Sequence, residues 1–322
     1  MKKSSKAIAL VVALAMVSML IGCNQSAQQQ QGKKKLVIGL SVSTLAFPWQ
    51  KSLTDNSLTE IDKLGGTAIV FDAQGRVDKQ NADIEDLIIK KVDIIIVNAI
   101  DGKAAVTAVV QANKAKIPVI ATSRRIEGGE IAQFISCDNV AGGEAAAKYL
   151  ADKMGGKGKV AMIEGTPGNS SSSDRTIGFK QGISKFPNIK LVYDRPGNFK
   201  RDVALALTED LLQAHPDIAG IFYQNDDMAI GGIRAIQSAG KLNKIAVISF
   251  DGIREVFPHI KDGEIGATIY NDAASIGTMS VESAFKVSRG EKVDSFASPP
   301  MPVITKTNVE QFIKNSGEVA NK

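Results

Sequence analysis

The chain repeats one pattern, in which a short apolar run is followed by a turn and then by an amphipathic stretch of helical period. Ten such runs occur, at residues 36–42, 67–72, 93–99, 118–122, 134–137, 159–165, 190–194, 220–225, 244–251 and 265–271. They are continuous rather than alternating in polarity, which is typical of parallel strands buried on both faces. Strands that alternate with helices predict an α/β fold with doubly wound parallel sheets. Because ten strands exceed one such sheet, we expect two α/β lobes.

The stretches between the runs predict the helices. Pro48 suits the first turn of a helix, apolar residues recur after it at helical spacing, and Gly65-Gly66 supplies a stop. Residues 83–91, 140–154, 203–214 and 226–239 show the same spacing. The Ser-rich stretch GTPGNSSSSDR (165–175) lacks the Gly-Lys-Ser/Thr ending of a phosphate-binding loop. We therefore expect a loop at a cleft edge there, and no nucleotide hydrolysis.

The start of the chain differs in composition from the rest. A basic stretch is followed by an almost wholly apolar run of about 16 residues and then by Cys23. This order is typical of a secretory signal, and Leu20-Ile21-Gly22-Cys23 looks like the lipobox of bacterial lipoproteins. The alternative, a transmembrane anchor, would need about 20 apolar residues. We expect a lipoprotein signal peptide at 1–22, a flexible Gln-rich tether at 23–34 and an extracytoplasmic protein that is lipid-anchored to the cell membrane through Cys23.

Charge and rare residues exclude several classes of function. The formal net charge is +5, but the expected signal peptide contains three of the 39 basic residues and none of the 34 acidic ones, so the remainder carries +2. That charge gives no electrostatic case for nucleic acid binding. Beyond Cys23 the chain has one cysteine, Cys137, so no intrachain disulfide is expected. His215 and His259 stand at no metal-ligand spacing, and we expect neither a metal nor a cofactor.

Polar side chains follow the predicted strands at their carboxyl ends, which is where ligands bind in sheets of this kind. They are Ser43, Asp72, Asn98, Asp101, Ser123, Arg124, Asn225, Asp226, Asp251 and Asn271. No histidine or cysteine nucleophile is among them. Carboxylates and amides can each bond two hydroxyl groups, and arginine donates a planar fork. The set therefore suits the binding of a hydroxyl-rich molecule better than it suits catalysis.

Four ordered stretches carry a family resemblance: VSTLAFPW (42–49), GFKQGI (178–183), FYQNDDMAIGGIRAIQSAG (222–240) and ISFDG (248–252). Together they resemble the ribose-binding branch of the periplasmic binding proteins of ABC transporters, from about Leu36 to about Thr307. The resemblance implies a type I fold, with two lobes that are joined by three crossovers and close on a ligand by hinge motion. It places the N-terminal lobe at 35–137 plus 272–300, and the C-terminal lobe at 138–271 plus 301–322.

The resemblance also implies a set of ligand-binding residues. Carried over by motif, they are Ser43, Phe47, Trp49, Gln50, Ser123, Arg124, Arg175, Phe199, Asn225, Asp251 and Asn271. Trp49 and Phe199 would stack on the apolar face of a sugar ring, and packing in the core is the alternative for both. Asn225 and Asp251 would bond ligand hydroxyls, and helix capping is the alternative.

Arg175 has a plain alternative too, because it could form a surface ion pair with Asp174 or Glu164; we favour the cleft. For Asn271, both a hinge role and a ligand role stay open.

Two adjacent arginines follow the run at 118–122. Successive side chains of a strand point to opposite sides, so we expect Arg124 in the cleft and Arg125 as a solvated surface charge. Pentose and hexose binders that resemble this chain usually carry an aspartate at the position of Ser123 and an amide at that of Phe47. Both changes reduce hydrogen bonding on the first-lobe side and leave the cleft arginines facing Asp251 alone. We favour a neutral sugar, while an anionic sugar derivative or polyol stays open.

The function implied by the resemblance is that of a monomeric binding protein without catalysis. It would capture a small sugar-like solute of the pentose or hexose class by lobe closure and deliver it to an ABC permease. A transcription regulator with the same core would need a helix-turn-helix where the signal and tether lie. A secreted enzyme could use Asp251 and Glu164 as paired carboxylates, but no nucleophile–base set is visible. A sensor that reports to a chemoreceptor or kinase shares the binding step and stays open.

Overall fold

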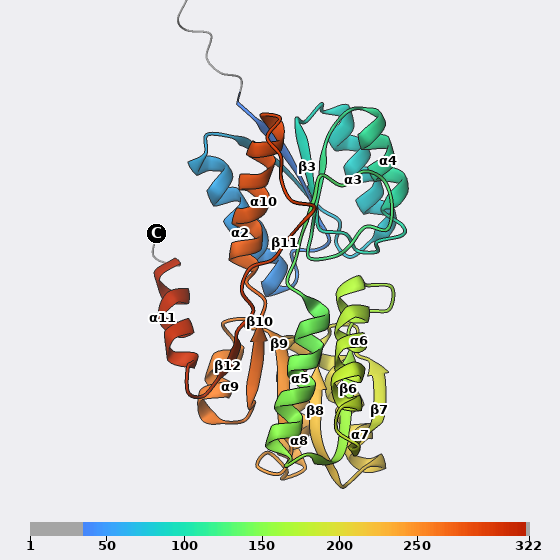
Figure 1. The fold of residues 1–322 in the computed structure, drawn as a ribbon, viewed down its shortest axis with the longest axis vertical. Coiled ribbons are helices and arrows are strands. Elements are labelled where there is room, and N and C mark those ends of the chain that lie inside the picture. The colour runs from blue at the N-terminus through green and yellow to red at the C-terminus, as the bar shows by residue number, and fades with distance from the viewer. Residues whose placement is uncertain (1–34, 320–322) are drawn as a thin grey trace, which may run out of the picture. The chain divides into compact units, whose positions relative to one another are not determined.

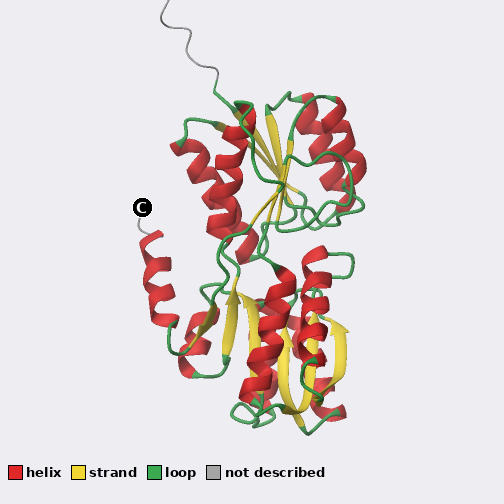
Figure 2. Cartoon of the chain, in the orientation of Figure 1, coloured by secondary structure: helices red, strands yellow, loops and turns green. Residues whose placement is uncertain are grey.

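The computed structural model of the protein describes residues 35–319, and Leu36 onward forms one compact unit. The expected signal peptide (1–22) and tether (23–34), with Cys23, lie outside the described residues. Two six-stranded sheets, each flanked by helices, form two lobes (Figures 1 and 2). The predicted fold class is thereby confirmed. None of the helices within residues 35–319 is long and apolar enough to cross a membrane.

The first lobe is built on a sheet with the strand order β11-β5-β4-β3-β1-β2, in which every pair is parallel. Its strands are β1 (Val37–Val42), β2 (Thr67–Asp72), β3 (Ile94–Val97), β4 (Val119–Thr122), β5 (Gln133–Ile135) and β11 (Phe296–Ala297). Helices α2 (Pro48–Lys63) and α10 (Ala273–Ser288) pack together on one face, and α3 (Val77–Ile89) and α4 (Val106–Lys114) on the other (Figure 1). The strands are therefore covered on both sides, as their continuous apolar runs predict.

The second lobe has the order β12-β10-β9-β8-β6-β7, with β12 antiparallel to β10 and the other pairs parallel. Its strands are β6 (Lys157–Glu164), β7 (Asn188–Pro196), β8 (Ile218–Tyr223), β9 (Ala246–Asp251), β10 (Ala267–Tyr270) and β12 (Val303–Thr305). Its helices are α5 (Asn139–Lys153), α6 (Ser170–Ser184), α7 (Arg201–Ala214), α8 (Asp226–Ser238), α9 (Val256–Asp262) and α11 (Val309–Val319).

Strand β6 shows how the two faces of this sheet are used. Val160 and Met162 pack in the cluster that contains residues of α5 and α6, while Ala161 and Ile163 pack with residues of α7 and α8. Successive side chains thus enter different cores, which requires an apolar residue at every position. Helices α5 and α6 approach so closely that a Cβ at Gly178 would lie 1.9 Å from the carbonyl oxygen of Val140.

The chain passes between the two sheets three times (Figure 2). The passages lie between β5 and α5, between β10 and α10, and between β11 and β12. Each is short, with three residues separating Ile135 from Asn139 and two separating Tyr270 from Ala273. These segments place the carboxyl ends of the strands in both lobes toward a shared space.

Every predicted strand region contains a strand, but the expectations for other segments were less accurate. Strands β11 and β12 have two and three residues, and neither was predicted. Helix α3 begins at Val77 rather than at residue 83. The expectation that the whole Ser-rich stretch is a loop is wrong, because Ser170 begins helix α6. Asn169 caps this helix, and its side chain accepts hydrogen bonds from two of the serine amides, at 2.9 and 3.4 Å.

Candidate functional site

One pocket lies beyond the carboxyl ends of the strands and is lined from both lobes. It holds about 430 Å³ of space between atoms, part of which is open to solvent. The lining residues are Phe47, Trp49, Gln50, Ser123, Arg124, Asn169, Ser171, Arg175, Phe199, Asn225, Asp227, Asp251 and Asn271. Ten of the eleven positions predicted from the sequence are in this set. Asn169, Ser171 and Asp227 were not predicted.

Ser43 is the predicted position that does not line this pocket. It is buried, and its hydroxyl donates to Asn98 Oδ1 at 2.7 Å. The amide of Asn98 in turn donates to the carbonyl of Thr122 at 3.2 Å. Ser43 therefore ties together the ends of β1, β3 and β4, which is a structural use of a polar residue at a strand end.

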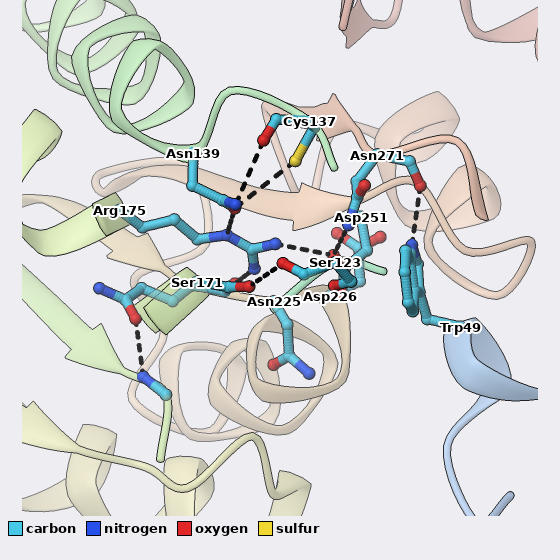
Figure 3. A network of polar contacts seen from close by, with 12 residues as sticks. Trp49, Ser123, Cys137, Asn139, Ser171, Arg175, Asn225, Asp226, Asp251 and Asn271 are labelled. Carbon is cyan, nitrogen blue, oxygen red and sulfur yellow. Dashed lines mark hydrogen bonds and ion pairs between the residues drawn. The ribbon is translucent and has the colours of Figure 1, made fainter. Parts of the chain in front are cut away.

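Arg175 lies at the centre of a polar network on the second lobe (Figure 3). Its side chain is only 4% exposed, and its guanidinium carbon is 3.5 Å from the centroid of the Phe250 ring. Nε donates to Asn139 Oδ1 at 2.9 Å, and Nη1 donates to the carbonyl of Gln224. Nη2 lies 3.4 Å from Asp251 Oδ1. The arginine is thus held rigidly by four partners and is paired with Asp251 rather than with either surface carboxylate considered above.

Asp251 sits at the end of β9 with a φ of +112°. Its Oδ1 also accepts a hydrogen bond from Asn271 Nδ2 at 3.2 Å. Burial raises the pKa of Asp251 to about 6, although Arg175 and Asn271 both favour its ionised form. Asn271 is itself 3% exposed, and its Oδ1 has no hydrogen-bond partner within the described residues. This corner of the pocket therefore presents acceptor oxygens to whatever fills it.

Three aromatic side chains line the pocket: Phe47 and Trp49 from the first lobe and Phe199 from the second. Trp49 is buried, and its Nε1 donates to the backbone carbonyl of Asn271 at 2.8 Å (Figure 3). Phe199 has a φ of +59°, and its ring occupies the space above Gly165, where an added Cβ would lie 2.0 Å away. Trp49 thus fulfils both interpretations made from the sequence, since it packs in the interior and also faces the pocket.

The first turn of α8 carries two residues with different tasks. Asn225 caps the helix by accepting from the Met228 amide at 3.0 Å, and it lines the pocket as well. Asp226 is fully buried behind it. Its carboxylate accepts from the Ser249 hydroxyl, from Thr268 Oγ1 at 2.7 Å and from the Ile253 amide at 2.8 Å. Burial, with the nearby charge of Asp251, raises the pKa of Asp226 to about 8.

Arg124 extends into the pocket from the first lobe and is half-buried. Its Nη1 donates to the carbonyl of Ala99 at 2.9 Å. No carboxylate among residues 35–319 lies within 4.0 Å of its guanidinium. Burial lowers the pKa of Arg124 to about 10, and the neighbouring charge of Arg175 acts in the same direction, while Asp251 opposes them.

Beside the pocket, residues 123–125 of the first lobe contact the start of α6 in the second. Ser171 Oγ donates to the Ser123 carbonyl at 2.9 Å, and the Arg125 amide donates to Ser170 Oγ at 2.8 Å. The Arg125 guanidinium pairs with Asp174 at 2.5 Å. We call these three contacts the clasp. Arg125 is 48% exposed, as expected of a surface charge, and the sequence did not show that its partner lies on the other lobe.

Cys137 lies at the passage from β5 to α5 and is buried. Its Sγ is 3.5 Å from Asn139 Oδ1, and burial raises the pKa of this thiol to about 11. A thiol in such surroundings stays protonated at neutral pH and does not act as a nucleophile. The described residues also contain no group of three or more His, Cys, Asp or Glu side chains that could hold a metal ion.

Comparisons with known proteins agree with this geometry. A family model described as "Periplasmic binding protein domain" matches residues 38–292. The chain is 38% identical to the ribose import binding protein of Bacillus subtilis over 93% of this chain and 99% of that protein. It is 37% identical to the ribose import binding protein of Escherichia coli K12, over 90% and 95% of the two chains.

Solved structures show the same likeness. The solute-binding protein of an ABC transporter from Bacillus halodurans, with bound myo-inositol, has a TM-score of 0.84 and 29% identity over 88% of this chain and 99% of that one. A corresponding protein from Actinobacillus succinogenes, with bound D-allose, has a TM-score of 0.83 and 30% identity over 86% and 100%.

Proposed function

Since the chain belongs to the periplasmic binding protein family, whose members bind solutes and are not enzymes, we propose that it captures a small sugar or sugar-like solute between its lobes. The observation that carries the proposal is the pocket, in which aromatic rings from both lobes and a ring of fixed polar groups converge. The similar proteins from Bacillus subtilis and Escherichia coli are ribose import binding proteins, and the similar structures hold a sugar or a cyclic polyol.

The proposed contacts divide by chemistry. Trp49, Phe47 and Phe199 would cover the apolar C–H faces of the solute, since aromatic rings offer a flat apolar surface. Asp251 and Asn271 would accept hydrogen bonds from its hydroxyl groups, because both present acceptor oxygens at one corner. The remaining proposed contacts are Gln50, Ser123, Arg124, Arg175 and Asn225, and we assign Ser43 to the support of the sheet.

The proposal extends to how the solute is captured and where the protein acts. The lobes, taken as 35–137 plus 272–300 and 138–271 plus 301–322, would close around the solute by bending near residues 137–138, 271–272 and 299–302. The loaded protein, a monomer, would deliver the solute to an ABC permease. A lipid on Cys23, added after removal of residues 1–22, would hold it at the outer side of the cell membrane.

A thermal-shift screen tests this function. The purified protein is unfolded and refolded to remove any solute that it carries, and is then heated with aldopentoses, aldohexoses, polyols and sugar acids. A solute at about 100 times its Kd stabilises a protein by about 2.7 kcal/mol, which corresponds to a rise in Tm of a few degrees. The proposed function is wrong if no member of the panel raises Tm at millimolar concentration.

Asp251→Asn is expected to weaken binding of the best solute by more than about tenfold, because it removes a charged acceptor while asparagine still tolerates the positive φ. Titration calorimetry measures the change. The matched control is Asp262→Asn, which alters an exposed carboxylate on the same lobe and should leave Kd unchanged. Equal Kd values for both variants would remove Asp251 from the ligand contacts.

The clasp yields a second expected result, at residues outside the pocket. Arg125→Gln should weaken solute binding about two- to fivefold, since an exposed ion pair contributes about 0.2–1 kcal/mol and this one joins the lobes. Asp174→Asn should give the same loss, and the double variant should lose no more than either single one. Arg195→Gln, at an exposed arginine of the second lobe, serves as the control. Additive losses in the double variant would contradict a functional pair.

A further inference from the structure

One of the four charged side chains that line the pocket has no ion-pair partner among the described residues. The four are Arg124, Arg175, Asp227 and Asp251. Asp227 is already paired, because its Oδ1 lies 2.6 Å from the guanidinium of Arg201, which also pairs with Glu255. Asp251 pairs with Arg175. The guanidinium of Arg124 is therefore the one charged group of this lining without an opposite charge within 4.0 Å among residues 35–319.

The immediate surroundings of Arg124 contain no opposite charge, and Asp251 acts on it only from beyond ion-pair distance. The one hydrogen bond of its side chain within the described residues goes to the neutral carbonyl of Ala99. Ser123, which precedes it, has a hydroxyl where a carboxylate would neutralise the guanidinium, and Phe47 and Trp49 from the same lobe are apolar neighbours in the pocket lining. A partly buried cation without an ion-pair partner is costly, and the cost grows when a ligand displaces the water around it. The pocket therefore favours a ligand that brings a negative charge.

The other side of the pocket favours a ligand that donates a hydrogen bond. Asn271 Oδ1 is buried and lacks a donor within residues 35–319, although its own Nδ2 is used by Asp251. An unpaired buried acceptor costs free energy that a donor on the ligand would recover. Hydroxyl groups are donors of the right kind, and the three aromatic side chains suit a ligand that also has apolar C–H faces.

We propose that the ligand is a sugar acid, a polyhydroxy carboxylate whose carboxylate pairs with Arg124 while a hydroxyl group donates to Asn271 Oδ1. This inference rests on the proposed function and specifies its ligand class. Arginine and carboxylate form a two-pronged, charge-assisted pair, which both gives Arg124 an opposite charge and fixes the orientation of the ligand. A phosphate ester carries about −1.5 to −2 charges at neutral pH, which is more negative charge than the single guanidinium of Arg124 can pair with.

Titration calorimetry with compounds of one chain length tests the proposal. The panel is D-ribonate, ribitol, D-ribose and D-ribose 5-phosphate, with the corresponding six-carbon set of D-gluconate, D-glucuronate, sorbitol and D-glucose. The acid should bind at least about tenfold more tightly than its neutral counterpart, and added salt should weaken the acid alone. Tighter binding of the neutral compound or of the phosphate would overturn the sugar-acid assignment and leave the proposed function intact. Failure of all of them would count against the proposed function itself.

A charge placed at residue 123 provides the sharper test. Ser123→Asp sets a carboxylate beside Arg124, and aspartate is among the residues that tolerate the φ of +62° found there. Its expected effect is to reverse the preference, with affinity for the acid falling about tenfold or more and that for the neutral sugar rising. Ser123→Asn has the same shape without the charge and should keep the preference for the acid. If the two variants behave alike, charge at Arg124 does not select the ligand.

Arg124→Gln covers the case in which Ser123→Asp does not fold. It removes the unpaired charge directly, keeps a donor near the Ala99 carbonyl and should abolish the difference between acid and neutral sugar. A preference for the acid that survives in Arg124→Gln would overturn the proposal.

Discussion

Replacing Arg175 with methionine is expected to lower the free energy of unfolding by about 3–5 kcal/mol and to abolish solute binding, because the change leaves a buried charge without its partner. Methionine fills much of the same volume above the Phe250 ring but offers no donor. Asp251 then loses its counter-charge, and the acceptors on Asn139 and Gln224 lose their hydrogen bonds. The network in Figure 3 would therefore lose its ion pair and these hydrogen bonds together.

Urea unfolding and calorimetry together measure this effect. Arg195→Met, at an exposed arginine of the same lobe, is the matched control and should change stability by less than about 0.5 kcal/mol. Arg175→Lys keeps the charge but not the planar fork, so an intermediate loss is expected. A loss below about 1 kcal/mol in Arg175→Met would mean that the buried pair does not hold the second-lobe side of the site together.

The second large effect concerns pH. Free energy of unfolding should fall by about 2–3 kcal/mol between pH 6 and pH 8 through Asp226 alone. Its pKa in the folded protein is about 8, raised mainly by burial, while an unfolded aspartate has a pKa of about 3.9. Between these values the folded carboxyl holds a proton and the unfolded one does not. The stabilisation is complete below the unfolded pKa and is lost as pH rises through the folded pKa.

Asp226→Asn should remove most of this change in the free energy of unfolding with pH. An asparagine oxygen can still accept from the Ile253 amide, and its amino group can donate to the hydroxyls of Ser249 and Thr268 once these rotate. Denaturation at pH 6, 7 and 8 compares the variant with wild type and with the exposed control Asp262→Asn, which should keep the wild-type slope. Asp251 titrates nearer pH 6 and contributes mainly at the acid end of this range. If the free energy of unfolding of Asp226→Asn changes with pH as in the wild type, other groups cause the pH dependence.

The strands could be predicted because burial on both faces produces a simple sequence pattern, a continuous apolar run. Residues such as Val160 and Ala161 enter different cores, so both must be apolar, and the run becomes continuous. Strands of two or three residues, such as β11, are too short to show such a pattern. Helix α6 escaped prediction for another reason. Its four serines are weak helix formers, and the helix is held by the Asn169 cap and by glycine-mediated packing such as that at Gly178, both of which depend on the folded structure.

The pocket residues could be predicted from the motifs that follow the strands, but their partners could not. The clasp joins residues 48 positions apart, Ser123 and Ser171, and no local pattern marks such a pairing. For the same reason Arg125 looked like an ordinary surface charge. Ser43 shows the converse, since a polar residue at a strand end can serve either the ligand or the sheet, and only the position of Asn98 decides which.

The burial of Cys137 also makes the folded part of this protein a convenient scaffold for an optical reporter. Thiol-directed dyes react with the thiolate, and a sulfhydryl whose pKa is about 11 supplies very little of it at neutral pH. A single cysteine added at an exposed site, such as Ile177 on α6, would therefore take up a dye while the native residue stays unmodified. Fluorescence from that one position could follow the opening and closing of the lobes without first removing Cys137 and disturbing the hydrogen bonds at the passage from β5 to α5.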